Sequence, residues 1–156
     1  MNWDALGAIS EALGAAGVIA SLIYLATQIR AQNRESRIAA SREVTDAFRE
    51  AVSSMQDDQR ASVVWKAMED IKSLSPPESL QINAIAQQYL RVWEQAHYQH
   101  LEGRLEQESW TAMNTQFIDF MALDVFSSVW AIRKNAFRES FRVYVESLDV
   151  GAYQLR

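Results

Sequence analysis

The sequence of 156 residues lacks cysteine, has only two prolines and five glycines, and carries no lysine or arginine before Arg30. The absence of cysteine excludes disulfides, thiolate metal sites and a cysteine nucleophile. Without alternating apolar and polar runs and turn pairs, the usual signs of strands and hairpins are missing as well. A cleavable signal peptide begins with a basic segment, and this N-terminus carries Asp4 instead, so we expect it to stay attached.

The remaining composition is that of a folded, acidic helical protein. Apolar residues make up 49% and charged residues 22%, and the aromatic residues include five tryptophans, so a packed core is expected. The net charge is −5, and no basic patch matches a nucleic-acid footprint, so nucleic-acid binding is disfavoured. Apolar residues recur with helical periodicity along most of the chain. We predict an all-α fold in which one N-terminal transmembrane helix continues into a cytoplasmic helical bundle.

The membrane prediction rests on residues 5–27, an apolar run long enough to cross a bilayer. Arg30, Arg34, Arg37 and Arg42 follow this run and no basic residue precedes it, so the positive-inside rule places the N-terminus outside. We therefore expect residues 1–30 to be the anchor and residues 31–156 a cytoplasmic domain at the bacterial inner membrane. The alternative is a buried core helix of a soluble protein. Glu11 favours that alternative, because a carboxylate in hydrocarbon is costly.

One face of the apolar run carries very small side chains at alternating spacings of three and four residues. We call this set the small-residue seam: Gly7, Ser10, Gly14, Gly17 and Ser21. This is the period at which two helices wind around each other, and small residues let their backbones approach closely in lipid. The pattern predicts association through residues 7–21, either with another copy of the chain or with another membrane subunit.

Glu11 has three interpretations. The span slides so that Glu11 reaches the outer headgroups and residues 12–29 cross the membrane, a length of about 27 Å at 1.5 Å per residue. Alternatively, the carboxylate pairs with a basic residue of another membrane subunit, or it handles ions in an oligomeric pore. The arginines at 30, 34, 37 and 42 set the topology and are expected to contact anionic lipid, with Glu35 and Glu43 interspersed.

The helices of the domain are delimited by caps and stops. The first helix is expected from about residue 3 to 56, with a cytoplasmic stripe formed by Ala40, Val44, Ala47, Phe48, Ala51, Val52 and Met55. Asp57 and Asp58 begin a short helix whose apolar face includes Ile71. Ser75 and Glu78 form a capping box before a helix that ends at Gly103. Three further helices are expected over residues 107–122, from Asp124, and from Phe137 through Leu148 to a stop near Gly151.

Glu94, His97 and His100 form the only cluster that suggests metal chemistry. Glu94 and His97 have the Glu-x-x-His spacing of half a di-iron site in a helical bundle, but the second Glu-x-x-His is missing. The two histidines lie three residues apart and so share a helix face, where they would hold one metal ion with a carboxylate. The other interpretation is that all three are polar core residues bonded to their neighbours. We predict no cofactor and infer no catalysis.

Several stretches resemble a family of proteins. They are Gly14 to Ala26 followed by Gln28-Ile29-Arg30, then Leu74-Ser75-Pro76, Trp93-Glu94 with Tyr98, Glu102-Gly103, Leu105 and Trp110. In these the chain resembles a widespread, uncharacterised family of short bacterial proteins with one N-terminal transmembrane helix and a cytoplasmic α-helical domain. The likeness weakens after residue 120, where residues 124–130 stand in place of a glycine-containing turn before a tryptophan pair. The resemblance implies topology and fold, and it implies no activity.

These observations favour a single-pass membrane protein that acts as an oligomerising anchor or protein–protein interaction module. The alternatives are an accessory subunit of a larger membrane complex, with Glu11 paired there, or a small oligomeric channel lined by Ser10, Glu11 and Ser21. An enzyme would have to rely on Glu94, His97 and His100.

Overall fold

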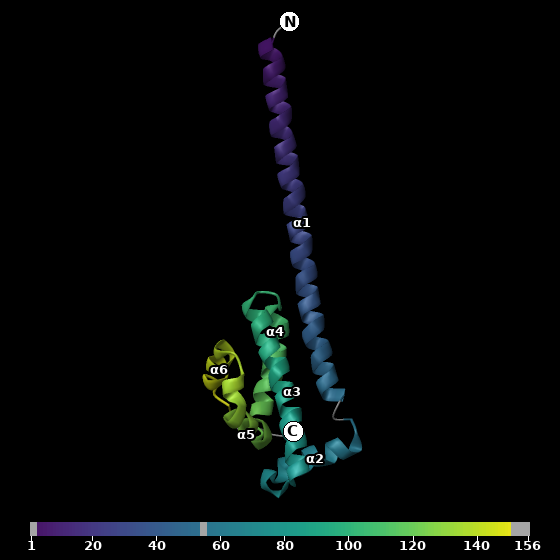
Figure 1. Ribbon diagram of the computed structural model, residues 1–156, viewed down its shortest axis with the longest axis vertical. Coiled ribbons are helices and arrows are strands. Elements are labelled where there is room, and N and C mark those ends of the chain that lie inside the picture. The colour runs from purple at the N-terminus through teal and green to yellow at the C-terminus, as the bar shows by residue number, and fades with distance from the viewer. Residues whose placement is uncertain (1–2, 54–55, 151–156) are drawn as a thin grey trace. The chain divides into compact units, whose positions relative to one another are not determined.

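The computed structural model describes residues 3–53 and 56–150, and every regular element in these ranges is helical (Figure 1). The predicted all-α class is thereby confirmed for the described residues. The elements are α1 (Trp3–Ser53), α2 (Asp58–Glu69), the short 3-10 helix η1 (Ile71–Ser73), α3 (Pro76–Leu101), α4 (Gln107–Met121), α5 (Asp124–Arg133), a second 3-10 helix η2 (Lys134–Ala136) and α6 (Glu139–Glu146).

The chain divides into two compact units, residues 1–38 and residues 39–156. In the first unit, α1 runs without a break because no glycine or proline lies between Gly17 and Pro76. It is long and apolar enough to cross a membrane, and none of its most apolar 18-residue window is buried. Its large apolar side chains, such as Leu13, Ile19 and Leu22, are exposed. This lack of burial differs from what the alternative of a buried core helix predicts.

The second unit is a bundle built around α3, which contacts α2, α4, α5 and α6. Figure 1 shows α3 running alongside α4 and α5, with α6 at one flank. Tyr89 and Trp93 on α3 are both 1% exposed and form the centre of the core. The expected stripe of α1 joins this core: Val44 and Ala51 are fully buried, and Phe48 packs edge-to-face on Tyr89. Val52 is exposed, and Met55 lies outside the described residues.

The predicted helix starts and stops are largely confirmed. The Asp57 carboxylate accepts the backbone N–H of Arg60 at 3.1 Å and caps α2. Ser75 and Glu78 form the expected capping box of α3. Gly103 adopts a φ of 65°, the left-handed conformation in which glycine avoids a steric cost, and it ends α3.

Two boundaries differ from expectation. Ile71 does not lie on α2, because Asp70 takes an extended backbone and its carboxylate accepts the N–H of Lys72, which starts η1 instead. Phe137 and Leu148 lie outside α6. The backbone of Phe137 is extended at the end of η2, and its ring is buried as part of the core. The expected stop near Gly151 lies outside the described residues.

Candidate functional site

The small-residue seam lies on one continuous exposed helix. A β-carbon at Gly7, Gly14 or Gly17 would meet no atom within 4 Å beyond its chain neighbours and the adjacent backbone of its own helix. Each glycine within a helix costs roughly 1 kcal/mol relative to alanine. The packing of this chain alone therefore gives no reason for glycine at the three positions. The side chain of Ser10 lies outside the described part of the structure.

A shallow groove follows the seam towards the arginines. It is lined by Gly14, Gly17, Val18, Ser21, Leu22, Tyr24 and Leu25. The hydroxyl of Ser21 donates to the carbonyl oxygen of Gly17 at 2.9 Å, so this polar group is satisfied within the helix. The walls of the groove are otherwise apolar side chains and helix backbone, which suits the approach of a second apolar helix.

Tyr24 and Gln28 extend the same face beyond the five residues predicted as the seam. The amide nitrogen of Gln28 donates to the Tyr24 hydroxyl at 2.6 Å. When heptads are counted from Gly7 at position a, Tyr24 is at a d position and Gln28 is at an a position. This heptad register places both residues on the face of the seam. The seam therefore ends in a hydrogen-bonded polar pair at the arginine end of the apolar run.

The predicted arginines divide between the two units. Arg30, Arg34 and Arg37, which we call the arginine stripe, lie in the first unit and are exposed. None of the three forms an ion pair with another residue in the described ranges. Arg42 is also exposed but belongs to the second unit. Glu11 is exposed and, within the same ranges, has no ion-pair partner either.

Glu94 holds the C-terminal part of the bundle to α3. One carboxylate oxygen accepts from the guanidinium of Arg91 at 2.8 Å, and the other accepts the backbone N–H of Arg138 at 2.7 Å. Arg91 also donates to the carbonyl oxygen of Ala136 at 3.0 Å, and its guanidinium lies over the ring of Phe137. Both oxygens of Glu94 are thus used to position the start of α6.

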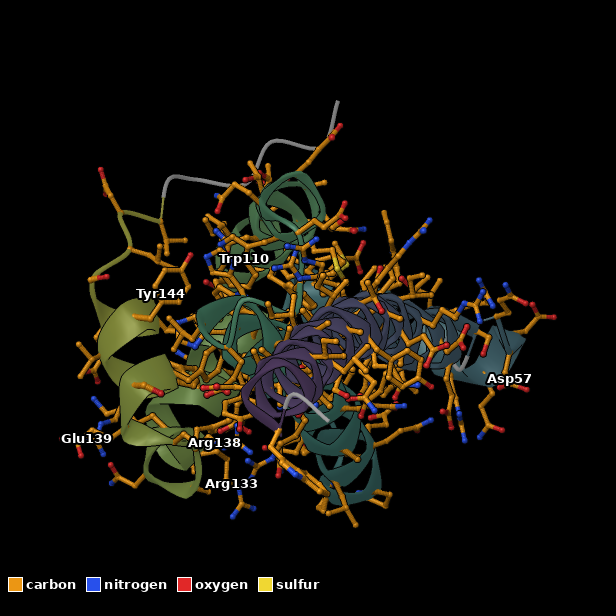
Figure 2. The ribbon with its side chains drawn as sticks, turned by 90° about the horizontal axis from the view of Figure 1, so that it is seen from above. Asp57, Trp110, Arg133, Arg138, Glu139 and Tyr144 are labelled. Atoms are coloured by element: carbon orange, nitrogen blue, oxygen red, sulfur yellow. The ribbon has the colours of Figure 1, made fainter. Side chains whose placement is uncertain are left out.

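His97 and His100 lie among aromatic rings. The His97 ring is 5% exposed and stacks on Tyr144 with ring centroids 4.7 Å apart, while His100 stacks on Trp110 at 4.9 Å. Figure 2 shows Trp110 and Tyr144 as neighbours, and their centroids are 5.7 Å apart. Burial lowers the pKa of His97, the nearby His100 lowers it further, and Glu94 opposes both effects.

The three candidate metal ligands therefore lie near one another, but the carboxylate points to Arg91 and Arg138 and the imidazoles pack against rings. Within the described ranges, no group of three or more histidine and acidic side chains is arranged to hold a metal ion. One cavity of about 200 Å³ lies between η1, α3 and α5, lined by Ile71, Leu74, Ser79, Ile82, Asn83, Ser128, Val129 and Ile132. Its lining contains no titratable side chain, so it offers no acid or base.

Comparison of the chain with protein-family models, with curated proteins and with solved structures gave no match.

Proposed function

We propose that the protein is a single-pass membrane anchor that self-associates through the small-residue seam and presents the helical bundle to a partner. The proposal includes a bacterial inner membrane location, an outer N-terminus and a cytoplasmic domain over residues 31–156. The resemblance to the bacterial family with this topology belongs to the same proposal. The observation that carries it is the row of glycines at seam spacing with open space around each.

A second copy of the chain suits this face. In a parallel pair related by a two-fold axis, each seam residue meets its own copy, so the face must be complementary to itself. The a and d positions from Gly7 to Ala31 carry no charge. The next a position is Glu35, where two carboxylates would repel, so the seam between copies ends before that residue.

The test is the mass of the full-length protein after extraction in a mild detergent. We expect one species of fixed copy number for the wild type and a monomer for Gly14→Ile, because the branched side chain separates the backbones. Ala12→Ile is the matched control. Position 12 is an f position on the opposite face, so the added bulk should leave the copy number unchanged. A monomeric wild type would reject self-association, and equal behaviour of the two variants would reject the seam as the contact surface.

A second candidate, an accessory subunit of a larger complex, is favoured by Glu11. This carboxylate is exposed on the apolar run at an e position beside the seam, and a basic residue on another subunit's helix would satisfy it. The same extraction separates the two candidates. An accessory subunit leaves its native membrane with other polypeptides, and Glu11→Gln releases it from them, whereas a self-associating anchor keeps its copy number in that variant.

A further inference from the structure

The arginine stripe and the small-residue seam lie on opposite faces of the first unit. At about 100° per residue, the centres of the two sets are roughly 170° apart around the helix. In heptad terms the seam occupies a and d positions. Arg30 and Arg37 occupy c positions, remote from the contact, and Arg34 occupies a g position at its margin. When the seam packs against a second copy, Arg30 and Arg37 therefore face the surroundings of the pair, and Arg34 lies at the margin of the contact with its long side chain open to the same surroundings.

The stripe is a local positive patch on an acidic chain. The whole protein carries a net charge of −5, yet the three exposed guanidiniums follow one another within about two turns. Glu35, the acidic residue between them, points to the other side of the helix at the same periodicity. Since none of the three forms an ion pair within the described part of the chain, their charge is available to an external anion.

The depth of the stripe matches a lipid headgroup layer. Arg30 directly follows Ile29, the last apolar residue of the run. Arg34 and Arg37 lie about 6 Å and 10 Å further along the axis at 1.5 Å per residue. The polar layer on each side of the hydrocarbon is about 5–8 Å thick, so long arginine side chains from these positions reach its phosphates. Guanidinium groups bind phosphate oxygens through paired N–H donors.

We propose that Arg30, Arg34 and Arg37 form a binding site for anionic phospholipid headgroups at the outer edge of the self-associated anchor. The site recruits a ring of anionic lipid around the assembled helices and leaves the helix–helix contact free of charge. This inference rests on the proposed membrane anchor, since it requires residues 12–29 to lie in the bilayer. It adds a specific lipid partner on a face that the seam does not use.

The test uses full-length protein reconstituted in phosphatidylcholine vesicles that contain a trace of spin-labelled phosphatidylglycerol or spin-labelled phosphatidylcholine. The fraction of label that is motionally restricted gives the relative association of each lipid with the protein. We expect the anionic lipid to be preferred about tenfold by the wild type, because each basic residue near the headgroups adds favourable electrostatic energy. High salt should weaken the preference by screening.

Two variants with the same change in charge separate the stripe from general electrostatics. The triple change Arg30→Gln, Arg34→Gln, Arg37→Gln should abolish the preference. The control Lys72→Gln, Arg104→Gln, Arg133→Gln removes three exposed charges from the second unit and should preserve it. Equal association of the two lipids with the wild type, or equal loss in both variants, overturns the proposal. Displacement of the labelled lipid by inorganic phosphate at constant ionic strength would also overturn it, in favour of a free-phosphate site.

Failure of this inference can be told apart from failure of the anchor itself. If the protein does not float with the vesicles, the membrane anchor is rejected and the lipid site with it. If it floats and keeps its copy number but shows no lipid preference, the lipid site alone is rejected. In addition, Gly14→Ile should become monomeric and still prefer the anionic lipid. The triple arginine variant should keep its copy number and lose that preference.

Discussion

At the scale of single residues, the buried Tyr89 and the partly buried Tyr144 have different surroundings. Tyr89 is 1% exposed among the rings of Phe48, Phe120 and Phe126, and its hydroxyl has no hydrogen-bond partner within the described residues. Burial raises the pKa of Tyr89 to about 12. Burial also raises the pKa of Tyr144, but a hydrogen bond with Asn114 opposes that rise. The Tyr89 hydroxyl is thus a cost to stability, and the Tyr144 hydroxyl is not.

We therefore expect Tyr89→Phe to raise the free energy of unfolding by about 1 kcal/mol, because it removes an unsatisfied buried hydroxyl. The comparison change Tyr144→Phe should not raise it, because the Tyr144 hydroxyl is only partly buried and lies beside the Asn114 side chain. The measurement is denaturant unfolding of the full-length protein in mild detergent, followed by tryptophan fluorescence. Equal destabilisation by both changes would show that Tyr89 has a partner.

At the scale of elements, one carboxylate connects two helices. Glu78 accepts the Ser75 backbone N–H at 2.7 Å within α3, and its two oxygens accept the Lys66 ammonium of α2 at 2.8 and 3.0 Å. The hydrogen bond from Lys66 is the largest cause of a pKa lowered from 4.5 to about 2, followed by the bond from the Ser75 backbone. The end of α2 and the start of α3 therefore depend on the same ionised group.

This predicts a specific loss of stability in acid. The pKa of Glu78 is lower in the folded protein than in the unfolded chain, so its contribution is complete above pH 4.5 and is lost as the pH falls towards 2. In Glu78→Gln, the melting temperature should fall less steeply than in the wild type as the pH is lowered from 4.5 to about 2. Glu108→Gln, at an exposed carboxylate without an ion pair in the described ranges, is the control and should leave the slope as it is. A slope unchanged in Glu78→Gln would contradict the assignment.

The elements also show what the sequence can predict. The capping box, the Asp57 cap and the Gly103 stop each depend on residues within a few positions, and all three are confirmed. The carboxylate of Glu94 behaves differently, since Arg138 lies 44 residues away and only the fold brings them together. Local spacing suggested a metal ligand at Glu94, whereas its observed partners are Arg91 and the start of α6. Contacts between distant segments are set by packing, which periodicity does not specify.

At the scale of the whole molecule, the division into two compact units leads us to expect that self-association and the stability of the bundle are independent of each other. Gly17→Ile, in the first unit, should lower the copy number in detergent and leave the melting temperature of the bundle within a degree or two, since distant sites act additively. Glu94→Ala, in the second unit, should lower the free energy of unfolding by about 1.5–3 kcal/mol and keep the copy number, because it removes the acceptor of the Arg138 backbone N–H and of the half-exposed Arg91 guanidinium.

Both readouts come from one preparation: the mass of the detergent-solubilised protein and the loss of tryptophan fluorescence on heating. Parallel changes in mass and melting temperature in either variant would show that association and folding of the bundle are coupled.

The attachment of α6 has a consequence for hydrogen exchange. A helix of eight residues is too short to persist alone in water, so α6 exists because Phe141 is fully buried and Glu94 holds its first residues. Its backbone amides are therefore expected to exchange with solvent together, each time the segment leaves α3. The exchange rate observed in α6 is then governed by a side chain of α3, and a change at Glu94 should accelerate exchange at amides more than forty positions later in the chain.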